Sequence, residues 1–119
     1  MLGPLVTIWG GTHPHIGALA LALPRPSLKN RQKTSATSSV LTLLGHKEDV
    51  TAKMVSEALA AGLNRNVVVT AGIHWDNLRP EEIGAINDLT KQLVEKIISK
   101  VEAPSPPPSP PKWKKGSNQ

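Results

Sequence analysis

The chain contains no cysteine, no phenylalanine and no tyrosine among its 119 residues. The lack of cysteine excludes disulfides, thiol catalysis and every cysteine-ligated zinc or iron–sulfur site. The lack of Phe and Tyr removes the side chains on which RNA-binding proteins usually stack bases. A metal site would therefore have to use histidines and carboxylates, and nucleic acid is not an expected partner.

Long hydrophobic runs are also missing. The longest apolar run, residues 16–23, is much shorter than the roughly 18 residues that a membrane-spanning helix requires. The first residues lack the basic opening of a signal peptide. The sequence therefore predicts a cytoplasmic protein without a membrane partner.

The net charge of +5 is unevenly distributed along the chain. Three of these charges, Lys112, Lys114 and Lys115, lie in a proline-rich segment at the C-terminal end, and residues 1–102 carry only +2. That value is ordinary for a folded domain. We predict one domain over residues 1–102 and a disordered or polyproline II tail over 103–119, either a spacer or a ligand for a proline-binding domain.

Four short, largely apolar runs predict strands, the first of them rich in β-branched residues. Pro24 and Pro26 are expected to end the second run, and residues 27–35 are expected to form an exposed basic loop. The last run begins with three consecutive valines instead of alternating apolar and polar residues, which is typical of a strand covered on both faces. The predicted strands are residues 5–9, 16–23, 36–44 and 67–71.

Two amphipathic patterns predict helices. The first begins after Lys47, with acidic residues in its first turn, and ends near Asn64; the second begins at Pro80. Apolar residues expected on the buried face of the second helix are Ile83, Ile86, Leu89, Leu93, Ile97 and Val101. We predict an α/β (α+β) fold of order β-β-β-α-β-α, with a mixed sheet and two helices packed on one face. Residues 36–71 are expected to form a right-handed βαβ crossover.

All four histidines lie in three glycine-marked stretches, residues 10–17, 45–47 and 71–77. Each stretch falls where an apolar run ends or resumes, which is where α/β proteins gather binding groups on loops. Imidazole can accept a proton, donate one or bind a metal near neutral pH. We therefore expect histidines from separate segments to converge on one site.

The first stretch places His13 and His15 on either side of Pro14. In an extended segment both side chains point to the same side, the geometry of a His-x-His metal pair. The alternative is a turn whose polar side chains satisfy loop backbone. Gly10 and Gly11 either let a ligand approach the backbone closely or simply form the turn.

The other two stretches offer groups of a different kind. Gly45, His46 and Lys47 precede a helix, so free amides and the positive helix end favour a phosphate, with Lys47 as its partner or as an ordinary surface lysine. In the third stretch, the indole of Trp75 either stacks on a planar ligand or covers the end of the core. Glu48 and Asp76 are the carboxylates that could complete a metal shell.

Four motifs in this order, residues 10–17, 36–47, 69–77 and 80–83, together resemble the prenylated flavin chaperone family of the LpdD type. These are small accessory subunits of UbiD-like hydroxyarene decarboxylases. The resemblance implies a non-catalytic protein that binds reduced prenylated FMN, protects it from oxidation and delivers it to the large decarboxylase subunit. It implies roles for His15, His46, Lys47, Gly72 and His74.

Some candidate cofactor-binding residues follow from the residue patterns and others from the resemblance. Together they are Gly10, Gly11, His15, Gly45, His46, Lys47, Gly72, His74 and Trp75. The alternative function is a metal-dependent hydrolase or lyase that uses histidines and carboxylates, with His13 and His15 as metal ligands. The small size and an open edge strand predict a homo-oligomer.

Overall fold

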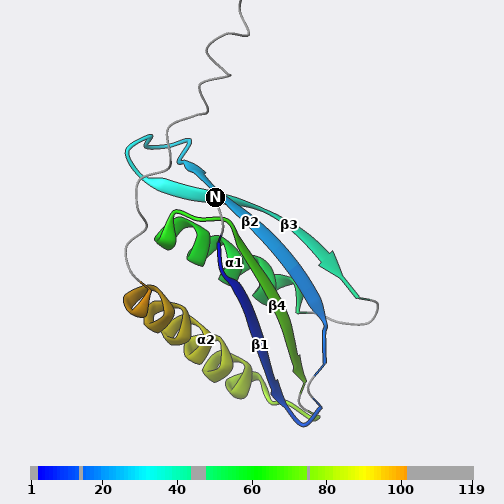
Figure 1. The fold of residues 1–119 in the computed structure, drawn as a ribbon. Helices are drawn as coiled ribbons and strands as arrows, with labels where there is room; N and C mark the ends of the chain where they lie inside the picture. The colour runs from blue at the N-terminus through cyan, green and yellow to red at the C-terminus, as the bar shows by residue number, and fades with distance from the viewer. Residues whose placement is uncertain (1–2, 14, 44–47, 75, 102–119) are drawn as a thin grey trace, which may run out of the picture.

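The structure is a computed structural model that describes residues 3–13, 15–43, 48–74 and 76–101 (Figure 1). Its elements are β1 (Leu5–Gly11), β2 (Ala18–Pro26), β3 (Thr34–Thr42), α1 (Asp49–Leu63), β4 (Val67–His74) and α2 (Pro80–Lys100). The predicted element order and the α+β fold with a mixed sheet are confirmed. The proline-rich segment 103–119 lies outside the described residues, so the prediction for the tail stays a prediction.

The four strands form one sheet in the order β1-β4-β2-β3. Strand β4 is parallel to β1 and antiparallel to β2, and β2 is antiparallel to β3. Strands β1, β3 and β4 therefore end at the same edge, where β2 begins. We call this edge, with its adjoining connections, the carboxyl edge.

The predicted crossover joins β3 through α1 to β4, and these two strands run in the same direction. They are not neighbours, however, because β2 lies between them. The connection is thus a split βαβ unit rather than an adjacent parallel pair. This arrangement places the start of α1 at the carboxyl edge, beside the end of β3.

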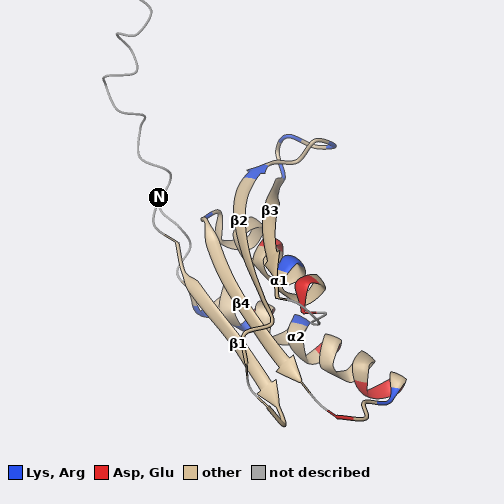
Figure 2. Ribbon diagram, turned by 90° about the vertical axis from the view of Figure 1, so that its right-hand side faces the viewer, with Lys and Arg blue, Asp and Glu red and all other residues tan. Residues whose placement is uncertain are grey.

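The two helices cover one face of the sheet, and the strands form the other layer (Figures 1 and 2). Leu59 of α1 is fully buried in a cluster with Val55, Val67 and Val69. Along β2, the residues facing α1 are alanines with no exposed surface: Ala18, Ala20 and Ala22. Side chains this small allow the helix to lie close to the sheet, so that the core is thin beneath the first half of α1.

All four predicted strands differ from the structure at one or both ends. Strand β1 continues through Gly10 to Gly11, and β3 spans Thr34–Thr42 instead of residues 36–44. The differences at β2 and β4 have a clear physical reason or bear on the site. Strand β2 continues through Pro24 and Pro26, which pair with β3, whereas its pairing with β4 stops at Ala22. Beyond Ala22 the strand has a free side, and proline is tolerated there because no donor is needed toward a neighbour. Strand β4 runs on to His74, so Gly72 and His74 lie within the strand and not in the predicted break after Ala71.

The predicted buried face of α2 is also partly wrong. Leu89 is 63% exposed and Leu93 is 43% exposed, whereas Thr90 and Val94 are buried. The Thr90 hydroxyl donates to the carbonyl oxygen of Ile86 at 2.8 Å, which makes its burial inexpensive. Because α2 lies at the margin of the helix layer, only a narrow stripe of its surface contacts the core.

A close approach between the helices explains one glycine of α1. A Cβ atom on Gly62 would lie 2.7 Å from the terminal carbon of Ile98 on α2.

Neither of the helices in the described part of the chain is long and apolar enough to cross a membrane.

Candidate functional site

Three imidazoles gather at the carboxyl edge. His74 ends β4, whereas His13 and His15 lie in the connection between β1 and β2. The ring centroid of His74 is 6.1 Å from that of His13 and 6.0 Å from that of His15. Histidines from two separate segments thus share one small region of the surface.

Glycines allow the β1–β2 connection to lie directly on the end of β4. A Cβ atom on Gly72 would overlap the carbonyl oxygen of His15, and one on Gly11 would overlap the carbonyl oxygen of His74. Gly11 also has a φ of +84°, which L-residues with a side chain rarely adopt. Both glycines are therefore required by the close packing of backbone that positions the histidines. Gly10, in β1, pairs with Ile73.

Backbone hydrogen bonds fix the same contact. The amide of Thr12 donates to the carbonyl oxygen of His74 at 2.8 Å, and the amide of Gly17 donates to the carbonyl oxygen of Ala71 at 2.9 Å. The connection is thus bonded to β4 before and after the histidines. Such bonds hold the imidazoles at defined positions rather than on a freely moving loop.

Both ring nitrogens of His15 face an acceptor. Its Nδ1 is 2.9 Å from the carbonyl oxygen of His13, and its Nε2 is 3.0 Å from Oε1 of Glu48. A carbonyl only accepts, so Nδ1 carries a proton, and the contact with Glu48 needs one proton more. The pair is therefore either imidazolium with carboxylate or neutral imidazole with carboxylic acid.

Glu48 is buried beside the sheet, with 9% of its surface exposed. It immediately precedes α1, and a Cβ atom on Gly17 would lie only 2.5 Å from its carboxyl carbon. The space that Gly17 leaves open is filled by this carboxyl group. We expected Glu48 to favour the helix dipole or a metal; the structure instead makes it the buried partner of His15.

His74 has a carboxylate partner in a different environment. Its Nε2 is 3.0 Å from Oδ1 of Asp76, and both side chains are about half exposed. An exposed pair of this kind adds little stability because water screens it. It does restrict the orientation of the His74 ring next to the His15–Glu48 pair.

Trp9 is an aromatic residue at this edge that the sequence reasoning did not select. It lies near the end of β1, pairs with Gly72 and is 66% exposed. The signal for it was an aromatic residue immediately before the Gly10–Gly11 pair. Its indole offers a flat apolar surface beside the histidine segment.

Four of the predicted site residues, Gly45, His46, Lys47 and Trp75, lie outside the described residues.

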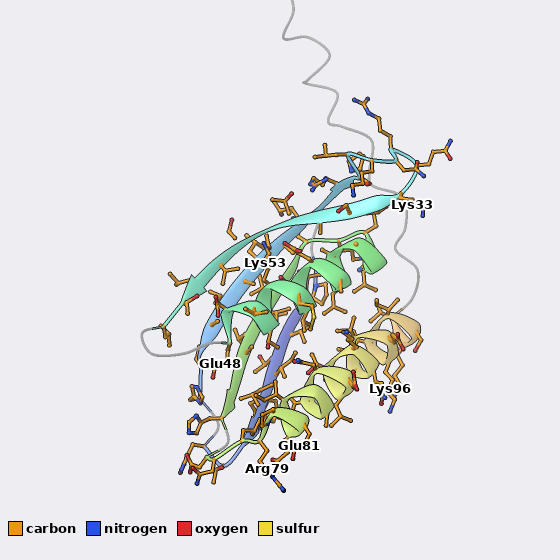
Figure 3. The ribbon with its side chains drawn as sticks, turned by 180° about the vertical axis from the view of Figure 1, so that it is seen from behind. Lys33, Glu48, Lys53, Arg79, Glu81 and Lys96 are labelled. Carbon is orange, nitrogen blue, oxygen red and sulfur yellow. The ribbon has the colours of Figure 1, made fainter. Side chains whose placement is uncertain are left out.

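Arg79, at the start of α2, forms ion pairs with neighbouring acidic residues. Its Nε donates to Glu82 at 2.7 Å and lies 3.9 Å from Glu81 (Figure 3).

The described residues contain no group of three or more histidines and carboxylates spaced to hold a metal ion. His15 would have to give up its contact with His13 or Glu48 in order to present a nitrogen to a metal. The metal pair of His13 and His15 therefore has no geometric support here, and it stays a prediction.

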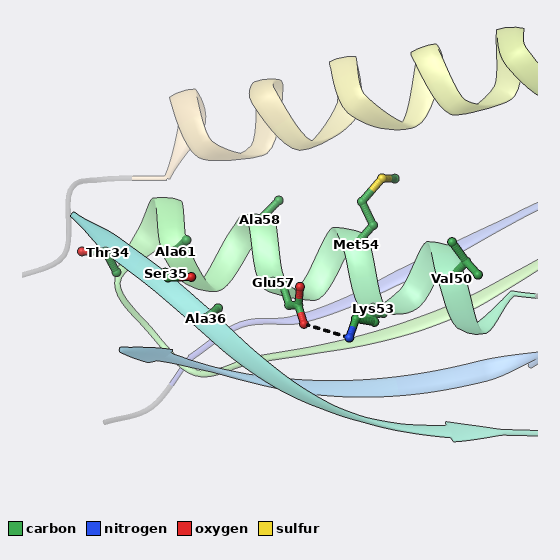
Figure 4. Close-up of a pocket in the computed structure, with 9 residues that line it drawn as sticks. All are labelled: Thr34, Ser35, Ala36, Val50, Lys53, Met54, Glu57, Ala58 and Ala61. Carbon is green, nitrogen blue, oxygen red and sulfur yellow. Dashed lines mark ion pairs between the residues drawn. The ribbon is translucent and has the colours of Figure 1, made fainter. Parts of the chain in front are cut away.

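A groove of about 460 Å³ lies away from the histidines, between the first half of β3 and the outer side of α1 (Figure 4). Its walls are mostly apolar, with Met54 and Ala58 on α1. The charged residues in it are paired: Nζ of Lys53 is 3.6 Å from Oε1 of Glu57, which also accepts from the Ser38 hydroxyl at 2.7 Å. This groove is a concave surface that offers an alternative to the histidine region as a binding site.

Residues 3–102 match the sequence model of the prenylated flavin chaperone LpdD-like domain. The chain belongs to the LpdD-like prenylated flavin chaperone family. The match covers all six elements of this LpdD-like domain, from β1 through α2. The resemblance based on the four motifs is thereby confirmed. A search of the curated proteins found no match.

Proposed function

We propose that this LpdD-like protein binds reduced prenylated FMN at the carboxyl edge and delivers it to the large subunit of a UbiD-like decarboxylase. The observation that carries this proposal is the convergence of His13, His15 and His74 at one edge of the sheet. In this role the protein is a non-catalytic carrier that acts as a homo-oligomer. When bound, the cofactor supplies the reactive ring system, and the chemistry takes place in the decarboxylase.

The described side chains fit the ring system of a flavin. A flavin ring has a polar edge of nitrogen and oxygen atoms and two flat faces, so a site for it needs donors, acceptors and an apolar surface. His74 and the His15–Glu48 pair supply the polar groups, and Trp9 supplies a flat surface beside them. The indole of Trp75 is a second proposed stacking surface.

The phosphate requires a cation and free amides. Arg79 already bonds Glu82, so we propose Lys47 as the cation for the phosphate, with the amides of Gly45 and His46, which precede α1 in the sequence. We propose Gly10, Gly11 and Gly72 as the backbone positions that hold the site in shape.

Glu48 is proposed as a positioning residue for His15. Its carboxyl group holds Nε2 while the His13 carbonyl holds Nδ1, so the ring cannot rotate without losing a hydrogen bond. A ring held in advance loses less entropy when the ligand binds. Glu48 is too deeply buried to be assigned a contact with the flavin itself.

We expect His15→Ala and His74→Ala each to weaken binding of reduced prenylated FMN by about fivefold to thirtyfold. Each change removes a hydrogen-bonding group worth roughly 1–2 kcal/mol, and 1.4 kcal/mol corresponds to a factor of ten. The measurement is an anaerobic titration followed by flavin absorbance and fluorescence. Gln92→Ala, a neutral change at an exposed position of α2, is the matched control and should bind as the wild type does.

Equal affinity in all four proteins would contradict the site. The alternative, a metal-dependent hydrolase or lyase, makes the opposite prediction. It requires a transition metal in near-stoichiometric amount by elemental analysis, and no uptake of flavin.

A further inference from the structure

In the described part of the chain, no helix or strand covers the face of the sheet opposite the helices, and only the β1–β2 connection packs on it, at Gly72 (Figure 2). Strand pairing aligns its residues in rows across the sheet, one of which contains Leu5, Val68 and Leu21. We call this surface the open face; its most prominent side chains are Leu5, Trp9, Leu21, Leu23 and Leu41. Each of these five side chains is at least 43% exposed.

The open face carries almost no charge. Lys, Arg, Asp and Glu lie on the helices and connections, and the described strands contain a single residue of these types, Arg25 near the end of β2 (Figure 2). Its Nε donates to the Thr37 hydroxyl at 2.6 Å. In the middle of the face, the Thr70 hydroxyl donates to that of Thr7 at 3.1 Å, so these polar groups bond within the sheet.

The apolar surface of the open face is as large as the largest apolar patches of ordinary monomers, which are often functional. Five large side chains with these exposures present on the order of 500 Å², near the upper end of the apolar patches that monomers expose. Together with the threonines and serines between them, the face approaches the roughly 800 Å² per partner that a stable interface buries.

We propose that the open face is the interface of a homodimer, in which a second copy of this chain stacks its own open face against the first. An uncharged apolar sheet is complementary to itself, because stacking two copies brings no like charges together. Two sheets pack face to face at a separation of about 10 Å, as in a β-sandwich. A partner with an acidic or basic surface would find no complementary charge on it.

This proposal does not depend on the flavin. The two-fold stacking is isologous, so the same residues of both copies meet, and the helix layers remain on the outside. His74 ends β4 on the same side of the sheet as Val68 and Thr70, so the histidine site adjoins the open face at the carboxyl edge, and Trp9 is shared by the site and the face.

Sedimentation velocity of the full chain tests this interface. The wild type is expected to sediment as a dimer at micromolar concentration. Leu41→Glu on the open face should raise the dissociation constant of the dimer at least a hundredfold, because it would bury a charge. Leu89→Glu on α2 is the matched control, since both leucines are 63% exposed, and it should remain a dimer.

Leu21→Ser, a milder change nearer the centre of the open face, should weaken the dimer at least tenfold and covers the case in which Leu41→Glu does not fold. A monomeric wild type would overturn the proposal. This holds even if the monomer assembles with the decarboxylase, because the open face would then not be a homodimer interface. Loss of the dimer in Leu89→Glu, with Leu41→Glu unaffected, would overturn it as well. A wild-type dimer that takes up no flavin would instead contradict the proposed function and leave the interface intact.

Discussion

Replacing Gly72 with alanine is expected to lower the free energy of unfolding by about 3 kcal/mol or more, at the upper end of the effects of overpacking. The new methyl group would occupy the position of the His15 carbonyl oxygen. The β1–β2 connection would then have to move away from β4 and would lose the hydrogen bond from Gly17 to Ala71. Thermal and denaturant unfolding measure the loss.

Gly84→Ala is the matched control for this change. Gly84 lies in α2, where a Cβ atom would meet nothing within 4 Å. Alanine has the higher helix propensity, so this variant should gain about 0.5–1 kcal/mol. If Gly72→Ala were as stable as the wild type, the backbone contact that positions His15 would be wrong.

Leu59→Ala is expected to cost about 2–5 kcal/mol, the usual loss for a large apolar side chain removed from a well-packed core. Leu59 is fully buried on α1 between the helix layer and the valines of β4. In a domain of this size, each kcal/mol lowers the melting temperature by about 4–8 °C. The melting temperature should therefore fall by roughly 10 °C or more.

Leu89→Ala provides the comparison for this second prediction. Leu89 belongs to the apolar pattern of α2, but it is 63% exposed. Its truncation should change stability by no more than about 0.5 kcal/mol. A large loss at Leu89 together with a small loss at Leu59 would mean that α2 packs through the face indicated by its sequence pattern and not through the one described here.

The order and type of the elements could be predicted because each has a strong local signal. Residues 67–71 form a continuous apolar run, and Pro80 with its acidic neighbours indicates a helix start. The sheet order could not be predicted, since nothing local shows that β4 inserts between β1 and β2. The prediction of the buried face of α2 failed for a related reason. Periodicity identifies an apolar stripe on a helix, but it does not show how much of that stripe a neighbouring element covers.

The candidate site could likewise be predicted only in part from the sequence. Glycine-marked histidines at element ends were sufficient to predict that His15 and His74 contribute to one region. Glu48 was not recognised as the partner of His15, because the two are 33 residues apart in the chain and meet only through the split crossover. The role of Gly72 was assigned to the cofactor from the family resemblance, whereas the structure gives it a packing reason as well.

NMR of the histidine rings is the most direct test of the central claim, that the imidazoles at the carboxyl edge form the flavin site. The reduced flavin is added anaerobically to protein labelled at histidine and at the methionine methyl groups. The account predicts shifts of His15 and His74, with the methyl signal of Met54, in the groove between β3 and α1, unchanged. Shifts confined to Met54, or none at the histidines at saturating flavin, would contradict it.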